Sequence, residues 1–260
     1  MTPAEPYAVE LASVSWRPGN REDVFSGVSF SVKQGESVAI CGARRVGKTT
    51  LLRLVARQLP PRRGTVRLMG RDIWLMSPAE TAEVLAVVPQ EAASDFALTV
   101  RQVVSSTRTP FRGGPVPAAE IVRRADAALA RVDLPDLADQ PFAQLPGPVR
   151  QRVLIARALT DDPKIPVLDN PGSLLDRADR QDLLRFLRGL GLTLVLSLDD
   201  PSLAAACTDR VLHLSEGRLV AGRPQARQSD DCATPGPWPR RRSGEAAGQR
   251  RRLPAPSVQG

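Results

Sequence analysis

Residues Gly42-Ala-Arg-Arg-Val-Gly-Lys-Thr49 fit the phosphate-binding pattern G-x-x-x-x-G-K-[ST]. Ser37-Val-Ala-Ile-Cys41 precedes it as a short apolar run, which is typical of a buried parallel strand. Residues 49–57 follow it with apolar side chains at helical spacing. A strand, a glycine-containing turn and a helix in this order form the context that the pattern requires. The sequence therefore predicts an α/β fold built around a phosphate-binding loop.

Each part of this loop suits the terminal phosphates of a nucleotide. Gly42 and Gly47 let the backbone curl so that successive N–H groups face a phosphate, and the start of the following helix adds its positive dipole end. The Lys48 ammonium would reach the β- and γ-phosphates, and the Thr49 hydroxyl would ligate Mg²⁺. An accidental glycine-rich turn is the alternative, which the flanking strand and helix disfavour. The loop predicts ATP and Mg²⁺ as cofactors, bound by Gly42, Ala43, Arg44, Arg45, Val46, Gly47, Lys48, Thr49 and Thr50.

The rest of the chain alternates between strand-like and helical patterns, which indicates a mainly parallel sheet. Strands are expected near residues 14–16, 28–32, 64–75, 84–88, 165–168, 192–196 and 210–214, and clear helices at 121–132 and 149–159. We expect one nucleotide-binding domain over residues 1–225, with a helical subdomain at about 91–160. Residues 226–260 are rich in Pro, Gly, Arg and Ala without periodicity, and we interpret them as a disordered tail.

Composition excludes several classes of protein. No run of 18 or more apolar residues is present to span a bilayer, and the first residues lack the pattern of a secretory signal. Cys41, Cys207 and Cys232 are too few and too widely spaced for a disulfide framework or zinc site, which favours a reducing, cytoplasmic setting. The net charge of +8 raises nucleic-acid binding as an alternative. No aromatic-basic platform for single strands accompanies it, so no specific nucleic-acid partner is expected.

Several further segments stand in a fixed order around the loop. They are Trp16 before Val24-Phe-Ser-Gly-Val-Ser-Phe30, Gln90 after Val87-Val-Pro, Arg150-Gln-Arg-Val-Leu-Ile-Ala-Arg-Ala-Leu159, Asp169 in Pro163-Lys-Ile-Pro-Val-Leu-Asp-Asn-Pro171, Ser173-Leu-Leu-Asp176, and Asp209-Arg-Val-Leu-His-Leu-Ser-Glu-Gly217. In this order they resemble the nucleotide-binding domain of ABC transporters, over about residues 7–224. The resemblance implies a P-loop NTPase core with a mainly parallel sheet, an N-terminal antiparallel β subdomain and a helical subdomain.

The resemblance also implies roles for individual residues. Trp16 matches the aromatic that stacks on adenine, although a core aromatic on a strand is the alternative. Gln90 matches the residue that touches Mg²⁺ and signals to the membrane subunit, and Asp169 the one that holds the water shell of Mg²⁺. The expected metal-site residues are therefore Thr49, Gln90 and Asp169.

The sequence departs from the family pattern at three places. Asn170 stands where the catalytic Glu is expected, and a neutral amide orients water but accepts no proton. Asp199 stands at the position of the switch His, where a carboxylate would repel the γ-phosphate; the only histidine, His213, is expected on a closing strand. The signature Leu-Ser-Gly-Gly-Gln appears as Leu145-Pro-Gly-Pro-Val149, in which Pro146 has no hydroxyl and Pro148 has no N–H to donate. Catalytic candidates are Gln90, Asn170 in place of Glu, and Asp199 in place of His.

A narrower resemblance concerns the cargo. Phe96-Ala-Leu-Thr-Val-Arg-Gln-Val-Val104 followed by Arg108-Thr-Pro-Phe111, and later Asp200-Pro-Ser-Leu-Ala-Ala205, resemble importers of iron-siderophore, haem and cobalamin type. The resemblance implies permease partners that span the membrane, a homodimer or heterodimer of ATP-binding subunits, and a position on the inner face of the cell membrane. Slow or residual ATP hydrolysis coupled to import is the first hypothesis. A non-hydrolysing regulatory or structural subunit and a decaying paralogue are the alternatives.

Overall fold

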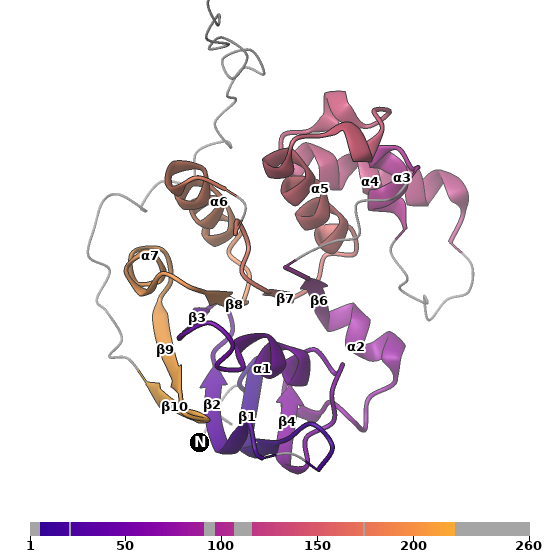
Figure 1. Cartoon of the computed structure of the whole chain (residues 1–260). Coiled ribbons are helices and arrows are strands. Elements are labelled where there is room, and N and C mark those ends of the chain that lie inside the picture. Colours follow the sequence, from indigo (N-terminus) through magenta and orange to yellow (C-terminus); the bar gives the residue numbers. More distant parts are fainter. Residues whose placement is uncertain (1–5, 21, 91–96, 107–115, 174, 222–260) are drawn as a thin grey trace, which may run out of the picture.

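The computed structural model describes residues 6–20, 22–90, 97–106, 116–173 and 175–221. The tail expected at 226–260 lies outside the described residues, as do Phe96 and residues 108–111 of the segment that resembles importers. Within the described ranges the chain forms two sheets and a group of helices (Figure 1). None of the helices in these ranges is long and apolar enough to cross a membrane.

The first sheet is antiparallel and contains four strands in the order β2-β1-β4-β5. Its members are β1 (Val9–Trp16), β2 (Phe25–Val32), β4 (Arg63–Leu68) and β5 (Arg71–Asp72). Alternate residues of β2 are buried, as the two-residue period of its sequence predicts. This sheet is the N-terminal antiparallel β subdomain that the resemblance to ABC transporters implies.

The second sheet holds the phosphate-binding loop and has the order β10-β9-β3-β8-β7-β6. Its strands are β3 (Ser37–Cys41), β6 (Leu85–Val88), β7 (Ile165–Leu168), β8 (Leu194–Leu198), β9 (Arg210–Ser215) and β10 (Arg218–Ala221). All neighbouring pairs are parallel except β9 and β10. Pro166 is tolerated inside β7 because β8 pairs only with Val167 and Leu168 of that strand.

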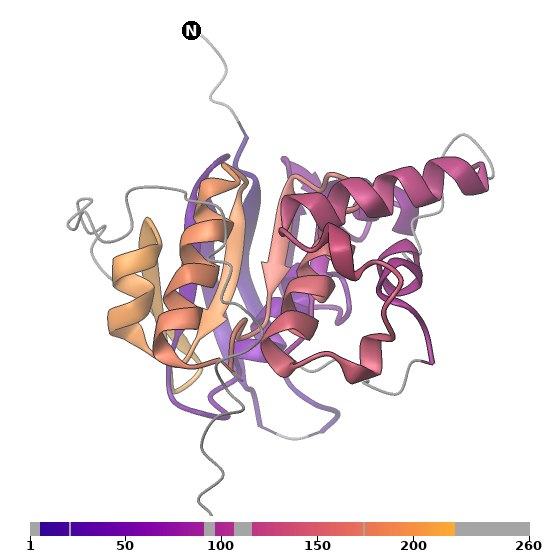
Figure 2. The same cartoon turned by 90° about the horizontal axis from the view of Figure 1, so that it is seen from above.

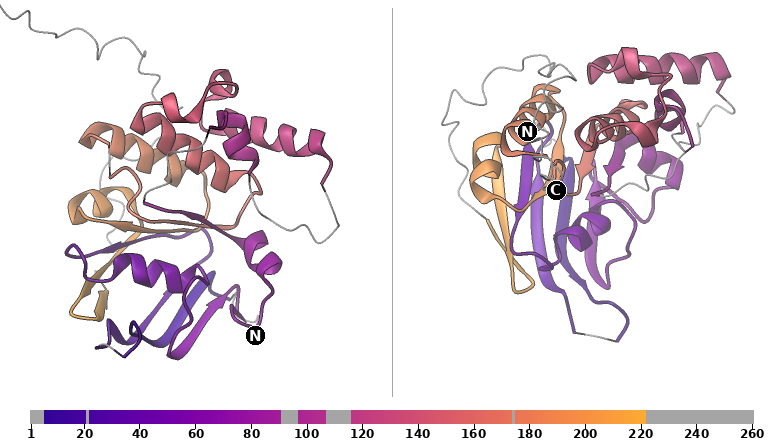
Figure 3. Two further views of the ribbon diagram at one scale, coloured as in Figure 1. Left: turned by 45° about the vertical axis from the view of Figure 1, so that its right-hand side comes forward. Right: turned by 45° about the horizontal axis from the view of Figure 1, so that its top comes forward.

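The parallel strands are apolar throughout because each face of this sheet packs on a hydrophobic cluster. In β3, Val38 and Ile40 belong to the cluster shared with the antiparallel sheet, whereas Ala39 and Cys41 belong to the cluster under the other helices. Helix α1 (Lys48–Val55) contributes Leu51 and other apolar residues to the first cluster. It therefore lies between the two sheets, as Figure 3 shows.

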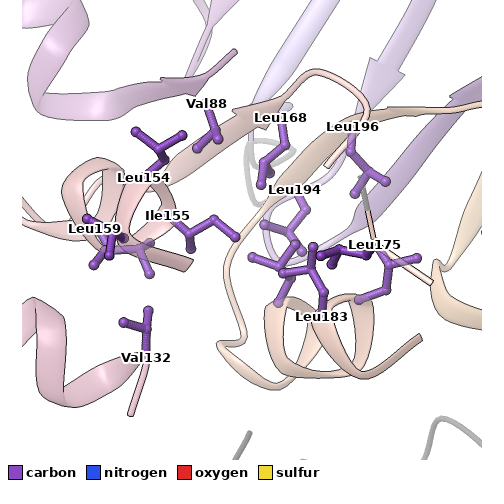
Figure 4. Close-up of a cluster of buried hydrophobic side chains, with 14 of the residues drawn as sticks. Val88, Val132, Leu154, Ile155, Leu159, Leu168, Leu175, Leu183, Leu194 and Leu196 are labelled. Carbon is purple, nitrogen blue, oxygen red and sulfur yellow. The ribbon is translucent and has the colours of Figure 1, made fainter. Parts of the chain in front are cut away.

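The cluster on the opposite face of the parallel sheet is formed with five further helices (Figure 2). They are α3 (Val100–Ser105), α4 (Ala118–Arg131), α5 (Gly147–Leu159), α6 (Arg177–Gly189) and α7 (Pro201–Cys207), of which α3 and α4 pack against each other and against α5. Figure 4 shows Ile155 and Leu159 of α5, Leu183 of α6, and Leu168 and Leu196 of the sheet within one buried cluster. The helical insertion and the sheet thus share a single core.

Several expected boundaries were wrong. The strand region expected at 64–75 contains two short strands, because a turn at Met69–Gly70 reverses the chain, and it ends at Asp72; Leu75 is 85% exposed. Val84 ends helix α2 (Pro78–Val84) instead of starting a strand. The strand expected at 192–196 is β8, two residues later, because Gly191 in a left-handed conformation and the following residues complete the turn after α6. Helix α1 begins at Lys48 and ends at Val55 rather than at residue 57.

Candidate nucleotide-binding site

The phosphate-binding loop connects β3 to α1 and requires glycine at two positions. A Cβ atom on Gly42 would lie 2.3 Å from the Leu214 carbonyl oxygen of β9. Gly47 has φ = +110°, and a Cβ atom there would lie 2.9 Å from side-chain atoms of Phe25 and Val24. The close approach of the loop to β2 and β9 therefore excludes a side chain at both positions.

The start of α1 presents backbone donors to the space beside the loop. The first hydrogen bond of this helix runs from Leu51 N to Gly47 O, at 2.9 Å. The N–H groups of Lys48, Thr49 and Thr50 come before it and have no carbonyl partner within the helix. Together with the positive end of the helix dipole, these groups suit an anion.

Lys48 is buried at the centre of this loop and has three close oxygen partners. Its ammonium donates to Gly42 O at 2.7 Å and to Ala43 O at 3.0 Å. It also forms an ion pair with Asp199, with 2.9 Å between Nζ and Oδ1. An ammonium has three N–H donors, so these contacts use all of them.

Asp199 follows β8 and is held by a second partner, Asn170. Asn170 Nδ2 donates to Asp199 Oδ2 at 3.1 Å. Partial burial raises the pKa of Asp199, but the Lys48 hydrogen bond and charge, with help from Asn170 and Arg44, outweigh burial and hold this pKa below its ordinary value. The carboxylate is therefore ionised near neutral pH.

Asn170 adopts a left-handed backbone conformation, with φ = +46°, and is 8% exposed. Asparagine tolerates this conformation better than most residues with a side chain. The conformation turns the chain sharply at the end of β7 and directs the Asn170 side chain toward Asp199, where its amide hydrogen bond is satisfied.

Ser197, which sequence reasoning missed, connects these residues. Its hydroxyl donates to Asp169 Oδ1 at 2.7 Å and accepts from Asn170 N at 2.8 Å, while the residue itself is fully buried. The one available signal was a polar residue inside the apolar run Leu194-Val-Leu-Ser-Leu198. Because the Ser197 proton goes to the carboxylate, Asp169 is fixed in orientation beside the loop.

These residues line one cavity of about 650 Å³. Its lining consists of Arg44, Arg45, Gly47, Lys48, Thr49, Thr50, Gln90, Asp169, Asn170, Ser197 and Asp199. The structure thus brings together most of the predicted binding, metal and catalytic residues. Gly42, Ala43 and Val46 lie in the loop but outside this lining. Trp16 lies at the end of β1, where it packs against the core beneath the antiparallel sheet, so its stacking on adenine stays a prediction.

The three residues expected at a metal ion lie close together. Thr49, Gln90 and Asp169 line both this cavity and a neighbouring one of about 350 Å³. A hydroxyl, an amide carbonyl and a carboxylate are oxygen donors, which fits Mg²⁺. No cluster of three or more His, Cys, Asp or Glu side chains suited to a metal occurs in the part of the chain that the structure describes. The donor set therefore fits an ion that keeps water and phosphate ligands.

The segment that stands in place of the family signature begins helix α5. Pro146 precedes the helix and Pro148 lies in its first turn, where proline is tolerated because those N–H groups have no partner within a helix. Leu145 is buried against the helical core. The segment is not part of the lining of the cavity beside the phosphate-binding loop. The two prolines thus leave the helix intact and change only the donors at its start.

Known proteins resemble this chain in sequence and in fold. A family model described as ABC transporter matches residues 25–173, more than half of the 260-residue chain. The hemin import ATP-binding protein HmuV of Streptomyces coelicolor is 37% identical over 227 residues, which cover 85% of this chain and 80% of that protein. The cobalamin import ATP-binding protein BtuD of Halobacterium salinarum is 34% identical over 210 residues, covering 78% of this chain and 52% of that protein.

Among solved structures, cbiO1 of Clostridium perfringens, part of an ABC transporter complex, superposes with a TM-score of 0.75 at 27% identity, covering 85% of this chain and 90% of that one. Proteins of this family bind ATP with Mg²⁺ and pair with permease subunits in transporter complexes. The likeness extends over the sequence and the fold. The chain therefore belongs to the ABC transporter family, as an ATP-binding subunit.

Proposed function

We propose that this chain is the ATP-binding subunit of an importer for a metal chelate of the haem, cobalamin or iron-siderophore kind. The relatives named for hemin and cobalamin import support this cargo class. As such a subunit it would bind permease subunits at the inner face of the cell membrane and pair with a second ATP-binding subunit, either a copy of itself or a related chain.

Nucleotide binding rests on one observation: the buried Lys48 ammonium stands at the centre of a glycine-constrained loop, inside a cavity large enough for phosphates. The N–H groups at the start of α1 would hold the β-phosphate. Thr49, Gln90 and Asp169 would hold Mg²⁺, which neutralises phosphate charge when it is bound. Trp16 is proposed to stack on adenine.

Hydrolysis is proposed to be slow because the two residues beside the phosphates are poor catalysts. Asn170 has no proton-accepting group, and general-base catalysis is typically worth about 10²- to 10⁴-fold in rate. Asp199 would face the attacking water with a negative charge that is already engaged by Lys48. The same contacts favour a second candidate, a subunit that binds ATP without hydrolysing it and acts as a regulatory or structural partner. A decaying paralogue remains the third interpretation.

Nucleotide binding is tested by titrating the purified full chain with Mg-ATP, using Lys48→Ala and the exposed Lys164→Ala as a matched pair. We expect Lys48→Ala to abolish binding, because it removes the only ammonium in the cavity lining, and Lys164→Ala to leave the affinity unchanged. Unchanged affinity in Lys48→Ala would refute the assignment of the site.

The slow ATPase and the non-hydrolysing subunit differ in how ATP hydrolysis responds when the missing catalytic groups are supplied. The double variant Asn170→Glu with Asp199→His supplies a general base and removes the carboxylate that competes for Lys48. A rise in phosphate release of about tenfold or more supports a slow ATPase. A variant that binds Mg-ATP but releases no more phosphate than the wild type, with candidate permease subunits present, supports the non-hydrolysing subunit.

A further inference from the structure

The ion pair between Lys48 and Asp199 engages the ammonium group that a third phosphate would need. In loops of this kind the lysine reaches the β- and γ-phosphates, while backbone N–H groups hold the β-phosphate. Here the third donor of Lys48 is taken by Asp199 Oδ1 at 2.9 Å. The donors at the start of α1 do not depend on this contact, since they are main-chain N–H groups.

A second hydrogen bond holds the Asp199 carboxylate in this position. Its Oδ2 atom accepts from Asn170 Nδ2 at 3.1 Å, and the buried Asn170 is itself fixed through its backbone N–H to Ser197 Oγ at 2.8 Å. Both carboxylate oxygens therefore have partners inside the cavity. Like a phosphate oxygen, the Asp199 carboxylate is negatively charged and binds the Lys48 ammonium.

From this arrangement we propose that Asp199 makes the site select a nucleoside diphosphate over a nucleoside triphosphate. The inference rests on the proposed nucleotide-binding function and concerns the specificity of the same site. The β-phosphate of a diphosphate is held by the backbone donors of the loop and is the one phosphate that competes with Asp199 for Lys48. A triphosphate brings one further phosphate, whose negative charge either faces the Asp199 carboxylate or displaces it.

Whether the third phosphate faces Asp199 or displaces it, triphosphate binding is weakened more than diphosphate binding. If Asp199 stays, two negative groups compete for one ammonium at close range, where the local dielectric is low. If it rotates outward, which its 44% exposed side chain permits, the ion pair and the hydrogen bond from Asn170 are lost. Arg44 and Arg45 also line the cavity and offset part of the repulsion. They act on both ligands, so the difference between the two ligands depends on Asp199.

The test measures two affinities for the full chain by isothermal titration in excess Mg²⁺: one for ADP, the other for the β,γ-imido analogue of ATP, which is not hydrolysed. We expect the wild type to bind ADP more tightly than the analogue. Asp199→Asn keeps the shape and removes the charge, so it should raise the affinity for the analogue about tenfold relative to that for ADP. Asp199→Ser should shift the ratio in the same direction, which guards against a misfolded first variant.

The matched control is Asp162→Asn, an exposed carboxylate paired with Arg131 far from the loop in sequence and outside the cavity lining. It should leave the ratio of the two affinities unchanged. A wild type that prefers the triphosphate analogue, or Asp199 variants that leave the ratio unchanged, would overturn the selectivity while leaving nucleotide binding intact. Absence of binding for both ligands would overturn the proposed function itself, together with the selectivity.

Discussion

At the scale of single residues, the phosphate-binding loop shows how close packing restricts the choice of amino acid. Gly47 has φ = +110° and lies against Phe25, the first residue of β2, and against Val24, which precedes that strand. Gly35, in the turn before β3, also has a positive φ, +73°, but a Cβ atom there would meet nothing within 4 Å. An alanine at Gly35 would therefore introduce backbone strain alone, whereas an alanine at Gly47 would introduce both strain and steric overlap.

We expect Gly47→Ala to lower the free energy of unfolding by about 2–4 kcal/mol, because strain and overlap add, and to weaken Mg-ATP binding severely. Gly35→Ala should cost about 1 kcal/mol from strain alone and leave nucleotide affinity unchanged. Urea denaturation and nucleotide titration of both variants check the difference. If the two substitutions changed nucleotide affinity equally, steric overlap at Gly47 would not be the reason for weaker binding.

At the scale of elements, the ends of the helices are determined by local hydrogen bonds. Helix α2 begins with a capping box in which Glu80 N donates to Ser77 Oγ and Ser77 N donates to Glu80 Oε2. The Ser77 backbone N–H, followed by the Arg71 side chain, lowers the pKa of Glu80 to about 2. The sequence Ser77-Pro-Ala-Glu80 carried this signal.

When folding lowers the pKa of a carboxyl group, its ionised form stabilises the folded protein. This stabilisation is complete above the pKa of the unfolded chain and is lost as the pH falls through the pKa of the folded protein. The stability difference between wild type and Glu80→Gln should therefore be constant above about pH 4.5 and shrink toward pH 2. Denaturation at a series of pH values measures it, with circular dichroism at pH 7 to confirm equal helix content. If the stability difference between wild type and Glu80→Gln did not change with pH, ionised Glu80 would not be what stabilises the start of α2.

At the scale of the whole molecule, the helical insertion and the parallel sheet are joined by one apolar cluster. Ile155 of α5 and Leu168 of β7 both belong to it, as Figure 4 shows. The helices of the insertion bury their apolar faces against each other and against the strands. The described chain should therefore unfold as a unit rather than as a separate sheet and helical part.

We expect a single calorimetric transition for the wild type, Ile155→Ala and Leu168→Ala. Each substitution should lower the free energy of unfolding by about 2–5 kcal/mol, because each leaves a cavity in the same cluster. Val220→Ala, at a site that is 61% exposed, is the matched control and should change little. A separate early transition in Ile155→Ala alone would show that the helical part is independent.

Much of the fold follows from local patterns in the sequence. The apolar runs at β3 and β7, and the pattern of the loop, are sufficient to predict the α/β class, which the structure and the family relatives confirm. The extent of segment 64–75 and the start of β8 depended on turns with positive φ at Met69 and Gly191, which apolar spacing does not reveal. Helix α6 was not among the helices expected from the sequence; Asp176 caps its start and it buries Leu183, Leu184 and Leu187.

The phosphate-binding loop could be predicted from local sequence, since Gly42, Gly47 and Lys48 lie within one short segment at a fixed spacing. The contacts of Lys48 with Asp199 and of Asp169 with Ser197 could not be predicted in that way, because they form only when the strands assemble. These partners are far apart in the chain, and they meet because β3, β7 and β8 are parallel neighbours whose carboxyl ends open at one edge of the sheet.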